Sequence, residues 1–138
     1  MATVNQVRYV DDSKATNPHA AAASLASFDS IIWIAGGQTK GTSFDDLVLR
    51  FGDRLRAVAL LGEDRLVIAN SLARHAPDVP VFISLSDKNE AMCEIVEWAA
   101  ARAKPGDVVL LAPGAASKDM YIDYAERGES FAAEVRKL

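Results

Sequence analysis

Ser30-Ile31-Ile32-Trp33-Ile34-Ala35 is a continuous apolar run that ends at Gly36-Gly37. A run of this length, rich in β-branched residues and without polar alternation, is typical of a strand that is buried on both faces of a sheet. The stretch therefore predicts a strand whose two faces are both covered by other elements.

The rest of the chain alternates strand signals with helix signals. Further apolar runs predict strands over residues 56–61, 79–84 and 108–112, and residues 7–10 predict a short extended lead-in. Helical spacing of apolar residues predicts helices over 18–26, 43–52, 66–76, 87–103 and from about 123 to the end. Strands that alternate with helices pair in parallel through right-handed crossovers. The sequence therefore predicts one domain over residues 1–138, an α/β three-layer sandwich with a Rossmann-like, mostly parallel sheet and helices on both faces.

Polar residues mark the expected helix starts. Asn17 before Pro18 is a strong N-terminal signal, because asparagine caps free backbone N–H groups and proline is tolerated at the first helical position. Ser43 with Asp46, and Asp87 with Glu90, have the spacing of capping boxes. In the last helix the charged residues alternate in sign and predict a solvated face; they are Glu126, Arg127, Glu129, Glu134, Arg136 and Lys137.

Composition limits the classes of function. Half of the residues are hydrophobic and a quarter are charged, which is typical of a globular domain. The net charge of −4 argues against nucleic acid as a partner, because phosphate binding needs a basic face. No apolar run reaches the roughly 18 residues of a membrane span and no signal peptide opens the chain, so we expect a cytoplasmic protein without membrane insertion. A single cysteine, Cys93, excludes an internal disulfide.

Three polar or small-residue loops follow predicted strands. They cover residues 12–17, 36–42 and 113–119, and they carry Lys14, Lys40 and Ser117. Because ligands of open α/β sheets bind beyond the carboxyl ends of the strands, we expect these loops to meet at one edge. Lysines, hydroxyls and glycines together suit a small anionic ligand. The other two segments of this kind, 62–64 and 85–87, are explained mostly by helix capping.

The sequence lacks the residue spacing of the well-known nucleotide-binding and catalytic motifs. Residues 36–42 differ from a phosphate-binding loop because Lys40 precedes Gly41 instead of following it. No strand is followed by G-x-G-x-x-G, and Ser117 has no G-x-S-x-G setting. His75 ends a helix, where a cation is favourable, and Asp11-Asp12 is at most a weak metal pair, so we predict no metal site on this chain.

Several motifs occur in the order found in one enzyme family. The motifs are Asp12-Ser13-Lys14-Ala15-Thr16-Asn17-Pro18, Gly36-Gly37 with Lys40, Gly106-Asp107 leading to Leu110-Leu111-Ala112-Pro113, Ala116-Ser117, and Arg127-Gly128 with Phe131. Through them the chain closely resembles the C-terminal domain of the Mur ligases. The segment D-S-K-A-T-N resembles the branch of that family that adds D-glutamate in peptidoglycan synthesis.

The resemblance implies one third of an ATP-dependent amide-bond ligase. Full-length members also have an N-terminal UDP-sugar domain and a central ATPase domain, and they activate a carboxylate as an acyl phosphate that the amine of D-glutamate attacks. ATP and Mg²⁺ would then be bound mainly by the central domain. We expect this chain alone to bind no cofactor and to be inactive, as an excised C-terminal domain or, alternatively, as the product of a split gene.

The resemblance also implies residue roles. Those that would hold D-glutamate are Thr16, Lys40, Ser117 and Tyr124, with Lys40 as the charge partner of a carboxylate. Asp12 would reach the ribose hydroxyls of ATP, and Lys14 the phosphates and the negative charge that develops during the reaction. The chain departs from the usual family pattern at three points: Tyr124 replaces phenylalanine, Gly114-Ala115 replaces an alanine–cysteine pair, and Lys118 replaces an apolar residue.

Two other functions remain open at this stage. One is a stand-alone, non-catalytic α/β module that binds a small dicarboxylate or a nucleotide. The other is a domain whose polar loops are only caps and turns.

Overall fold

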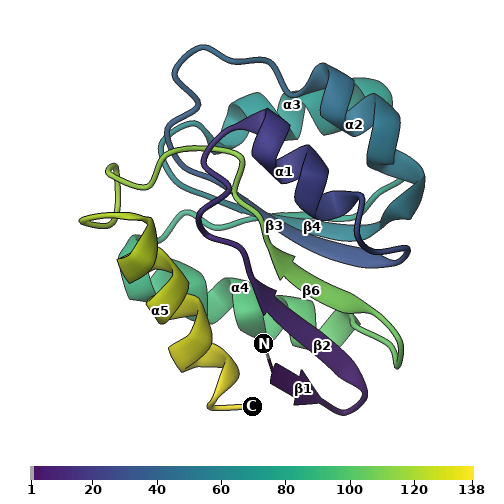
Figure 1. Cartoon of the computed structure of the whole chain (residues 1–138). Helices are drawn as coiled ribbons and strands as arrows, with labels where there is room; N and C mark the ends of the chain where they lie inside the picture. Colours follow the sequence, from purple (N-terminus) through teal and green to yellow (C-terminus); the bar gives the residue numbers. More distant parts are fainter. Residues whose placement is uncertain (1) are drawn as a thin grey trace.

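The computed structural model describes residues 2–138 and shows a six-stranded sheet with helices on both faces (Figure 1). The elements, in chain order, are β1 (Ala2–Val4), β2 (Val7–Asp11), α1 (Pro18–Leu25), β3 (Ile31–Gly36), α2 (Asp45–Phe51), a 3₁₀ turn η1 (Gly52–Arg54), β4 (Leu55–Leu61), α3 (Arg65–His75), β5 (Val81–Ile83), α4 (Lys88–Arg102), β6 (Val108–Leu111) and α5 (Tyr124–Val135). The strand order is β1-β2-β6-β3-β4-β5, and every neighbouring pair except β1–β2 is parallel. The predicted three-layer, mostly parallel α/β fold is confirmed.

Two apolar cores lie on opposite faces of the sheet because successive strand residues point to opposite sides. Ile31, Trp33 and Ala35 face a core built with α1, α2 and α3. Ile32 and Ile34, the alternate residues of the same strand, face a core built with α4 and α5. All five side chains are fully buried. The run over 30–35 is thus the central strand that its composition predicts.

The first strand was not predicted. Ala2–Val4 pairs antiparallel with β2, and the two strands are joined by Asn5 and Gln6, which both have positive φ angles of 52° and 65°. A two-residue connection of this kind is a type I′ hairpin turn, for which Asn-Gly is the usual signal. Glutamine at the second position removes that signal, so the sequence did not reveal the hairpin.

Two of the three predicted capping residues, Asn17 and Asp87, stand directly before their helices, and Ser43 does not. The Asn17 side chain accepts the N–H of Ala20, as a cap should. Ser43 is not the cap of α2: that helix begins at Asp45 after Phe44, which makes no side-chain cap bond. Asp87 does precede α4, but its carboxylate accepts the adjacent Lys88 N–H instead of an N–H further along the helix.

The prediction of a fully solvated α5 is wrong for two of its charged residues. Arg127 is 1% exposed and Glu134 is 7% exposed. Arg127 shares its side of α5 with Phe131, which packs into the core against the sheet, whereas Glu134 faces Cys93 of α4. Alternating charge along a helix predicts a solvated face only when the charged side chains have no buried hydrogen-bond partners. Arg127 has three buried acceptors, the hydroxyl and carbonyl of Ser13 and the carbonyl of Ala115.

Candidate functional site

The three predicted loops meet at the carboxyl edge of the sheet. β2, β6 and β3 are consecutive neighbours in the sheet and run parallel, so their carboxyl ends lie side by side. In Figure 1 the loops that leave these ends gather on the left-hand side of the molecule, next to the start of α5. The edge therefore holds the three predicted loops, residues 12–17, 36–42 and 113–119, together.

The Lys40 loop and the Ser117 loop are paired directly. The Gln38 N–H donates to the Ala116 carbonyl oxygen at 2.8 Å, and the Ala116 N–H donates back to Gln38 at 3.0 Å. This close approach requires Gly37: a Cβ there would lie 2.2 Å from the Ala116 oxygen, and its φ is +131°. Lys40 follows Gln38 by two residues and Ser117 follows Ala116 by one. The bridge between Gln38 and Ala116 therefore holds Lys40 and Ser117 on the same side of the molecule.

Local hydrogen bonds shape the turn that carries Lys40. Asp64, at the start of α3, accepts the Thr39 N–H at 2.9 Å and the Thr39 hydroxyl at 3.2 Å. The Thr42 hydroxyl donates to the Thr39 carbonyl at 2.6 Å. Between them Lys40 has a left-handed backbone, with φ of +54°, and an exposed side chain. Its ammonium is therefore free to meet a ligand while its backbone is tied down.

The first loop begins directly at the end of β2. The Asp12 N–H extends the β2–β6 ladder to Leu111, and the Ala15 N–H closes a turn onto the Asp12 carbonyl. The Gly114 N–H then donates to the Ala15 carbonyl at 2.8 Å. Thr16, half-buried, follows this contact and precedes the capped start of α1. The loop is thereby joined to the same strand extension that leads to Ser117.

Asp12, Lys14 and Tyr124 share one cavity of about 310 Å³. It lies between the first loop and the N-terminus of α5, and Glu129 of α5 also contributes to its wall. Lys14 is exposed and Asp12 is half-buried, whereas the Tyr124 side chain is 42% exposed. The predicted site residues therefore form two groups: this cavity, and the bridged loops with Lys40 and Ser117.

Arg127 of α5 connects the loop that carries Lys14 with the loop that carries Ser117. Its Nε and Nη2 donate to the hydroxyl and the carbonyl of Ser13, and its Nη1 donates to the Ala115 carbonyl at 3.0 Å. The Ser13 hydroxyl in turn donates to the Tyr124 carbonyl at 2.7 Å. Burial lowers the pKa of Arg127 to about 10, and the charge of Asp119 opposes that shift, so the guanidinium is protonated at neutral pH. One buried cation thus fixes the first loop, the third loop and the start of α5.

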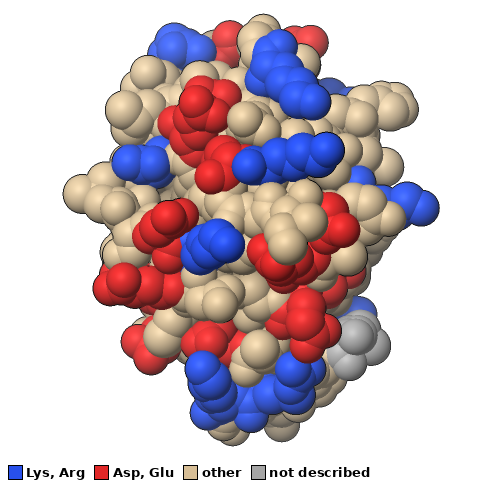
Figure 2. Space-filling view, turned by 90° about the vertical axis from the view of Figure 1, so that its left-hand side faces the viewer, with Lys and Arg blue, Asp and Glu red and all other residues tan. Residues whose placement is uncertain are grey.

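The surface around these loops carries both signs of charge. Figure 2, which faces the left-hand side of Figure 1, shows Lys and Arg side chains interspersed with Asp and Glu, without a broad region of one sign. A polyanion would need a continuous basic surface. Isolated lysines on polar loops instead suit a small anion.

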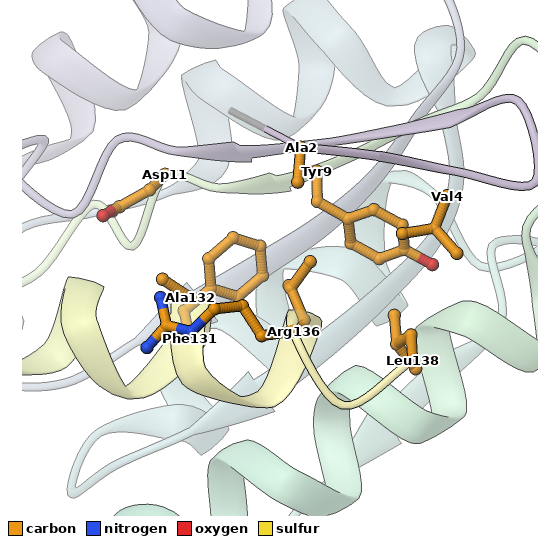
Figure 3. A pocket seen from close by; sticks show the side chains of 9 residues that line it. Ala2, Val4, Tyr9, Asp11, Phe131, Ala132, Arg136 and Leu138 are labelled. Carbon is orange, nitrogen blue, oxygen red and sulfur yellow. The ribbon is translucent and has the colours of Figure 1, made fainter.

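A second cavity, of about 460 Å³, lies between the β1–β2 hairpin and α5 (Figure 3). Its wall is mostly apolar, with Tyr9, Phe131 and Val135, and Asp11 and Arg136 are its charged members. Asp11 also lines the first cavity, and its carboxylate accepts the Ser13 N–H. This second cavity contains none of the predicted site residues.

The described residues contain neither a metal cluster nor a membrane span. Residues 2–138 bring no three His, Cys, Asp or Glu side chains together where they could hold a metal ion. Within the same range, no helix combines the length and the hydropathy that crossing a bilayer demands.

Comparison with known proteins identifies the class of this chain, an α/β domain whose candidate site is built from loops at the carboxyl edge of its sheet. Residues 1–115 match the family described as "Mur ligase, glutamate ligase domain". The chain belongs to this family of Mur ligase domains.

Curated relatives align along the entire chain. The UDP-N-acetylmuramoylalanine–D-glutamate ligases of Streptomyces coelicolor and Thermobifida fusca are 53% and 55% identical to it over 138 residues. The ligase of the same name from Frankia casuarinae is 57% identical over 136 residues. The chain spans only 29%, 30% and 28% of the lengths of these three proteins.

A solved structure shows the same fold. A domain assigned to a UDP-N-acetylmuramate:L-alanyl-γ-D-glutamyl-meso-diaminopimelate ligase from Haemophilus ducreyi superposes with a TM-score of 0.60. The superposition covers 96% of this chain and 95% of that one, at 16% sequence identity.

The sequence does not reveal how two residues, Arg127 and Asp64, hold the loops of this edge. The charge pattern of α5 predicts a solvated Arg127, but its neighbour Gly128 is a contrary signal: a Cβ there would lie 2.6 Å from the Asp11 carboxylate, so the helix must approach β2 closely. The position of Asp64 predicts a helix cap, but α3 has no side-chain cap bond, and the Asp64 carboxylate accepts hydrogen bonds from Thr39 instead. Nothing in the spacing of Asp64 and Thr39, 25 residues apart, reveals this contact.

Proposed function

We propose that this chain is the C-terminal, D-glutamate-binding domain of an ATP-dependent ligase that joins D-glutamate to UDP-N-acetylmuramoyl-L-alanine. The relatives that align over its whole length carry the name of that ligase. The remainder of such a protein, which this chain does not span, would provide the UDP-sugar domain and the ATPase domain. Residues 1–138 would then act as one domain of the enzyme, and the chain alone would be inactive.

The observation that carries the proposal is the backbone bridge between Gln38 and Ala116. It holds an exposed lysine and a serine hydroxyl on adjacent loops, which is what a dicarboxylate ligand requires. Lys40 provides a positive charge for one carboxylate, and Ser117 and Thr16 provide hydroxyl donors. Tyr124 lines the cavity that also holds Asp12 and Lys14, so it would meet D-glutamate from the side of the nucleotide.

The nucleotide would meet this chain at the other group of residues. Asp12 can accept hydrogen bonds from sugar hydroxyls, and the exposed ammonium of Lys14 can pair with phosphate oxygens. The magnesium ligands would belong to the ATPase domain, which this chain does not span. ATP, when bound, supplies the activation of the carboxylate that is to be joined.

This chain's own contribution would be positioning and electrostatics. Holding the amine of D-glutamate beside an activated carboxylate replaces a collision between two molecules by a reaction within one complex. Lys14 would stabilise the negative charge that grows on the oxygens of the reacting group. Both effects depend on loops that move little, and the bridge and Arg127 provide that rigidity.

The test uses a chimera in which this chain replaces the matching 138-residue segment of the Streptomyces coelicolor relative. The chimera should release phosphate only when D-glutamate and UDP-N-acetylmuramoyl-L-alanine are both present. Lys40→Ala and Ser117→Ala should each raise the KM for D-glutamate about 10- to 100-fold, the worth of a hydrogen bond to a charged group. Lys104→Ala is the matched control, because Lys104 lies on the turn before β6, at the opposite edge of the sheet.

Two outcomes would contradict the proposal. One is a folded chimera that forms no product. The other is a chimera whose KM for D-glutamate is the same in the Lys40 and Ser117 variants as in the Lys104 control. Saturable binding of a dicarboxylate or nucleotide without product formation would favour the stand-alone binding module instead.

A further inference from the structure

The turn between β4 and α3, residues 62–64, contacts both loops that carry the proposed D-glutamate ligands. On one side, the Asp64 carboxylate accepts the N–H and the hydroxyl of Thr39, the residue before Lys40. On the other side, the Glu63 N–H donates to the Asp119 carboxylate at 2.7 Å, two residues beyond Ser117. The turn therefore ties the Lys40 loop and the Ser117 segment to a common support.

The backbone of this turn also lies directly against the Lys40 loop. The Asp64 N–H donates to the Gly37 carbonyl at 3.0 Å. Gly62 allows the approach, because a Cβ on it would lie 2.6 Å from the Gly37 nitrogen. Since β4 is the sheet neighbour of β3, the contact is part of the rigid framework and not a crossing of two mobile loops.

Asp64 is not used for the task that its position in sequence suggests. It precedes α3, where an aspartate ordinarily caps the helix by accepting one of the first free N–H groups. Here α3 has no side-chain cap bond, and the Oδ2 atom of Asp64 accepts both donors of Thr39. Asp64 therefore stabilises the turn that begins at Thr39 and not the start of α3.

The conformation of Lys40 depends on the shape of that turn. A lysine with φ of +54° occupies the left-handed region, which is unfavourable for a residue with a side chain and persists only when neighbouring bonds enforce it. Thr39 is held on one side by Asp64 and by the Thr42 hydroxyl on the other. The Thr42 N–H also closes the turn onto the Thr39 carbonyl at 3.1 Å, so Asp64 is the contact that ties this turn to the start of α3.

We propose that Asp64 is a positioning residue for D-glutamate: it acts through Thr39 to hold Lys40 in the left-handed conformation that directs its ammonium to the ligand. This inference rests on the proposed function of Lys40. It assigns to Asp64 no contact with substrate or nucleotide.

The first test measures kinetics in the chimera described above. Asp64→Ala should raise the KM for D-glutamate about 10-fold and leave the KM for ATP unchanged, because only the D-glutamate ligand is misplaced. Asp64→Asn keeps an oxygen that can accept from Thr39, so its KM should rise only about 2- to 3-fold. In a Lys40→Ala background, Asp64→Ala should raise the KM no further, since Asp64 acts only through Lys40.

Asp107→Asn is the matched structural control. Asp107 is likewise a carboxylate that holds turns together, accepting from Ser30 and from the Lys104 N–H, but it lies at the amino edge of the sheet. A purely structural loss lowers the amount of active enzyme and hence the apparent kcat, with both KM values unchanged. The Asp107 variant should show that pattern, and the Asp64 variants should not.

The second test does not depend on activity. In the isolated chain, NMR should show faster amide hydrogen exchange at Thr39 in Asp64→Ala than in the parent chain, and exchange at Thr39 should be unaltered in Asp107→Asn.

The outcomes separate the two proposals. If Lys40→Ala raises the KM for D-glutamate and Asp64→Ala does not, the positioning role is wrong and the proposed function stands. If neither variant changes that KM, the proposed function of Lys40 is wrong. If Asp64→Ala leaves exchange at Thr39 unaltered, the structural basis of this inference is wrong whatever the kinetics show.

Discussion

The Arg127 guanidinium holds Ser13 at two points, donating through Nε to the hydroxyl at 2.9 Å and through Nη2 to the carbonyl at 2.8 Å. Its remaining terminal nitrogen donates to Ala115. No carboxylate is hydrogen-bonded to the guanidinium among the described residues, so its buried charge is stabilised mainly by neutral oxygens. A residue of the last helix thereby sets the position of two loops that are about 100 residues apart in sequence.

Arg127→Lys should lower the free energy of unfolding by about 3 kcal/mol. A lysine cannot reach all three acceptors, and each buried oxygen left without a donor costs about 1–3 kcal/mol. Urea denaturation of the isolated chain measures the change. The control is Arg136→Lys, whose exposed pair with Glu129 should contribute less than about 1 kcal/mol. Equal effects in the two variants would contradict the structural role given to Arg127.

Gly37→Ala should disrupt the bridge between the Lys40 and Ser117 loops. The added Cβ would lie 2.2 Å from a backbone oxygen of Ala116, which cannot move without breaking the pairing with Gln38. Gly41→Ala is the control, because Gly41 also has a positive φ but a Cβ on it would meet no other atom within 4 Å. Gly41→Ala should cost only the backbone strain of about 1 kcal/mol, and Gly37→Ala at least about 2 kcal/mol more. Thermal unfolding followed by circular dichroism compares the two variants.

Asp45 makes stability depend on pH in the acid range. Its hydrogen bond from the Ser71 hydroxyl, followed by its bond and charge interaction with Arg74, lowers the pKa of this carboxyl to about 2. Because the folded-state pKa lies below that of the unfolded chain, the stabilisation is present above about pH 4 and is lost as the pH falls toward 2.

The Asp45→Asn variant tests this pH dependence. Its urea midpoint should lie below that of the parent chain at pH 6, and the difference should shrink as the pH falls from about 4 to about 2. The neighbouring exposed Asp46→Asn is the control and should show a much smaller difference at pH 6. A difference that stays constant from pH 6 to pH 2 would show that Asp45 contributes nothing through its ionised form.

Cys93 should react slowly with thiol reagents. A hydrogen bond with Glu134, then burial, then the neighbouring Glu97 raise the pKa of the thiol to about 11. At pH 8 this leaves about 100-fold less thiolate than an ordinary cysteine has, and the greater nucleophilicity of a more basic thiolate recovers part of the loss.

The alkylation rate with iodoacetamide at pH 8 should therefore be about 10-fold lower in the folded chain than in the urea-unfolded chain. Glu134→Gln should restore part of the rate. The same rate in the folded and unfolded chains would show that the carboxylates around Cys93 do not control its reactivity.

Local patterns were sufficient for most of the fold. The uninterrupted apolar run over 30–35 predicts a strand covered on both faces, and the structure confirms it with complete burial of residues 31–35. Asn17 before Pro18 predicts the start of α1, and the cap bond is present. Such predictions succeed because the periodicity of burial and the capping of helix ends depend on residues that are close in sequence.

Local sequence patterns located the candidate site but did not predict the contacts that hold it together. Parallel strands that alternate with helices imply that loops after the strands share an edge, and this placed Lys14, Lys40 and Ser117 on one side. Which residues fix those loops could not be predicted. Arg127 looked like part of a solvated charge pattern, and Asp64 looked like a helix cap.

The amino-acid order alone was enough for the element types, the layered α/β class, the edge where the candidate site lies and the likeness to one ligase family. The β1–β2 hairpin, the burial of Arg127 and the bond from Thr39 to Asp64 became visible only in the folded chain. The hairpin has a turn without its usual glycine, and Arg127 lies among oxygens that two distant loops contribute. The Asp64 carboxylate accepts from a donor that is 25 residues away. Contacts between remote segments depend on how the elements pack around the sheet, and no short-range pattern carries that information.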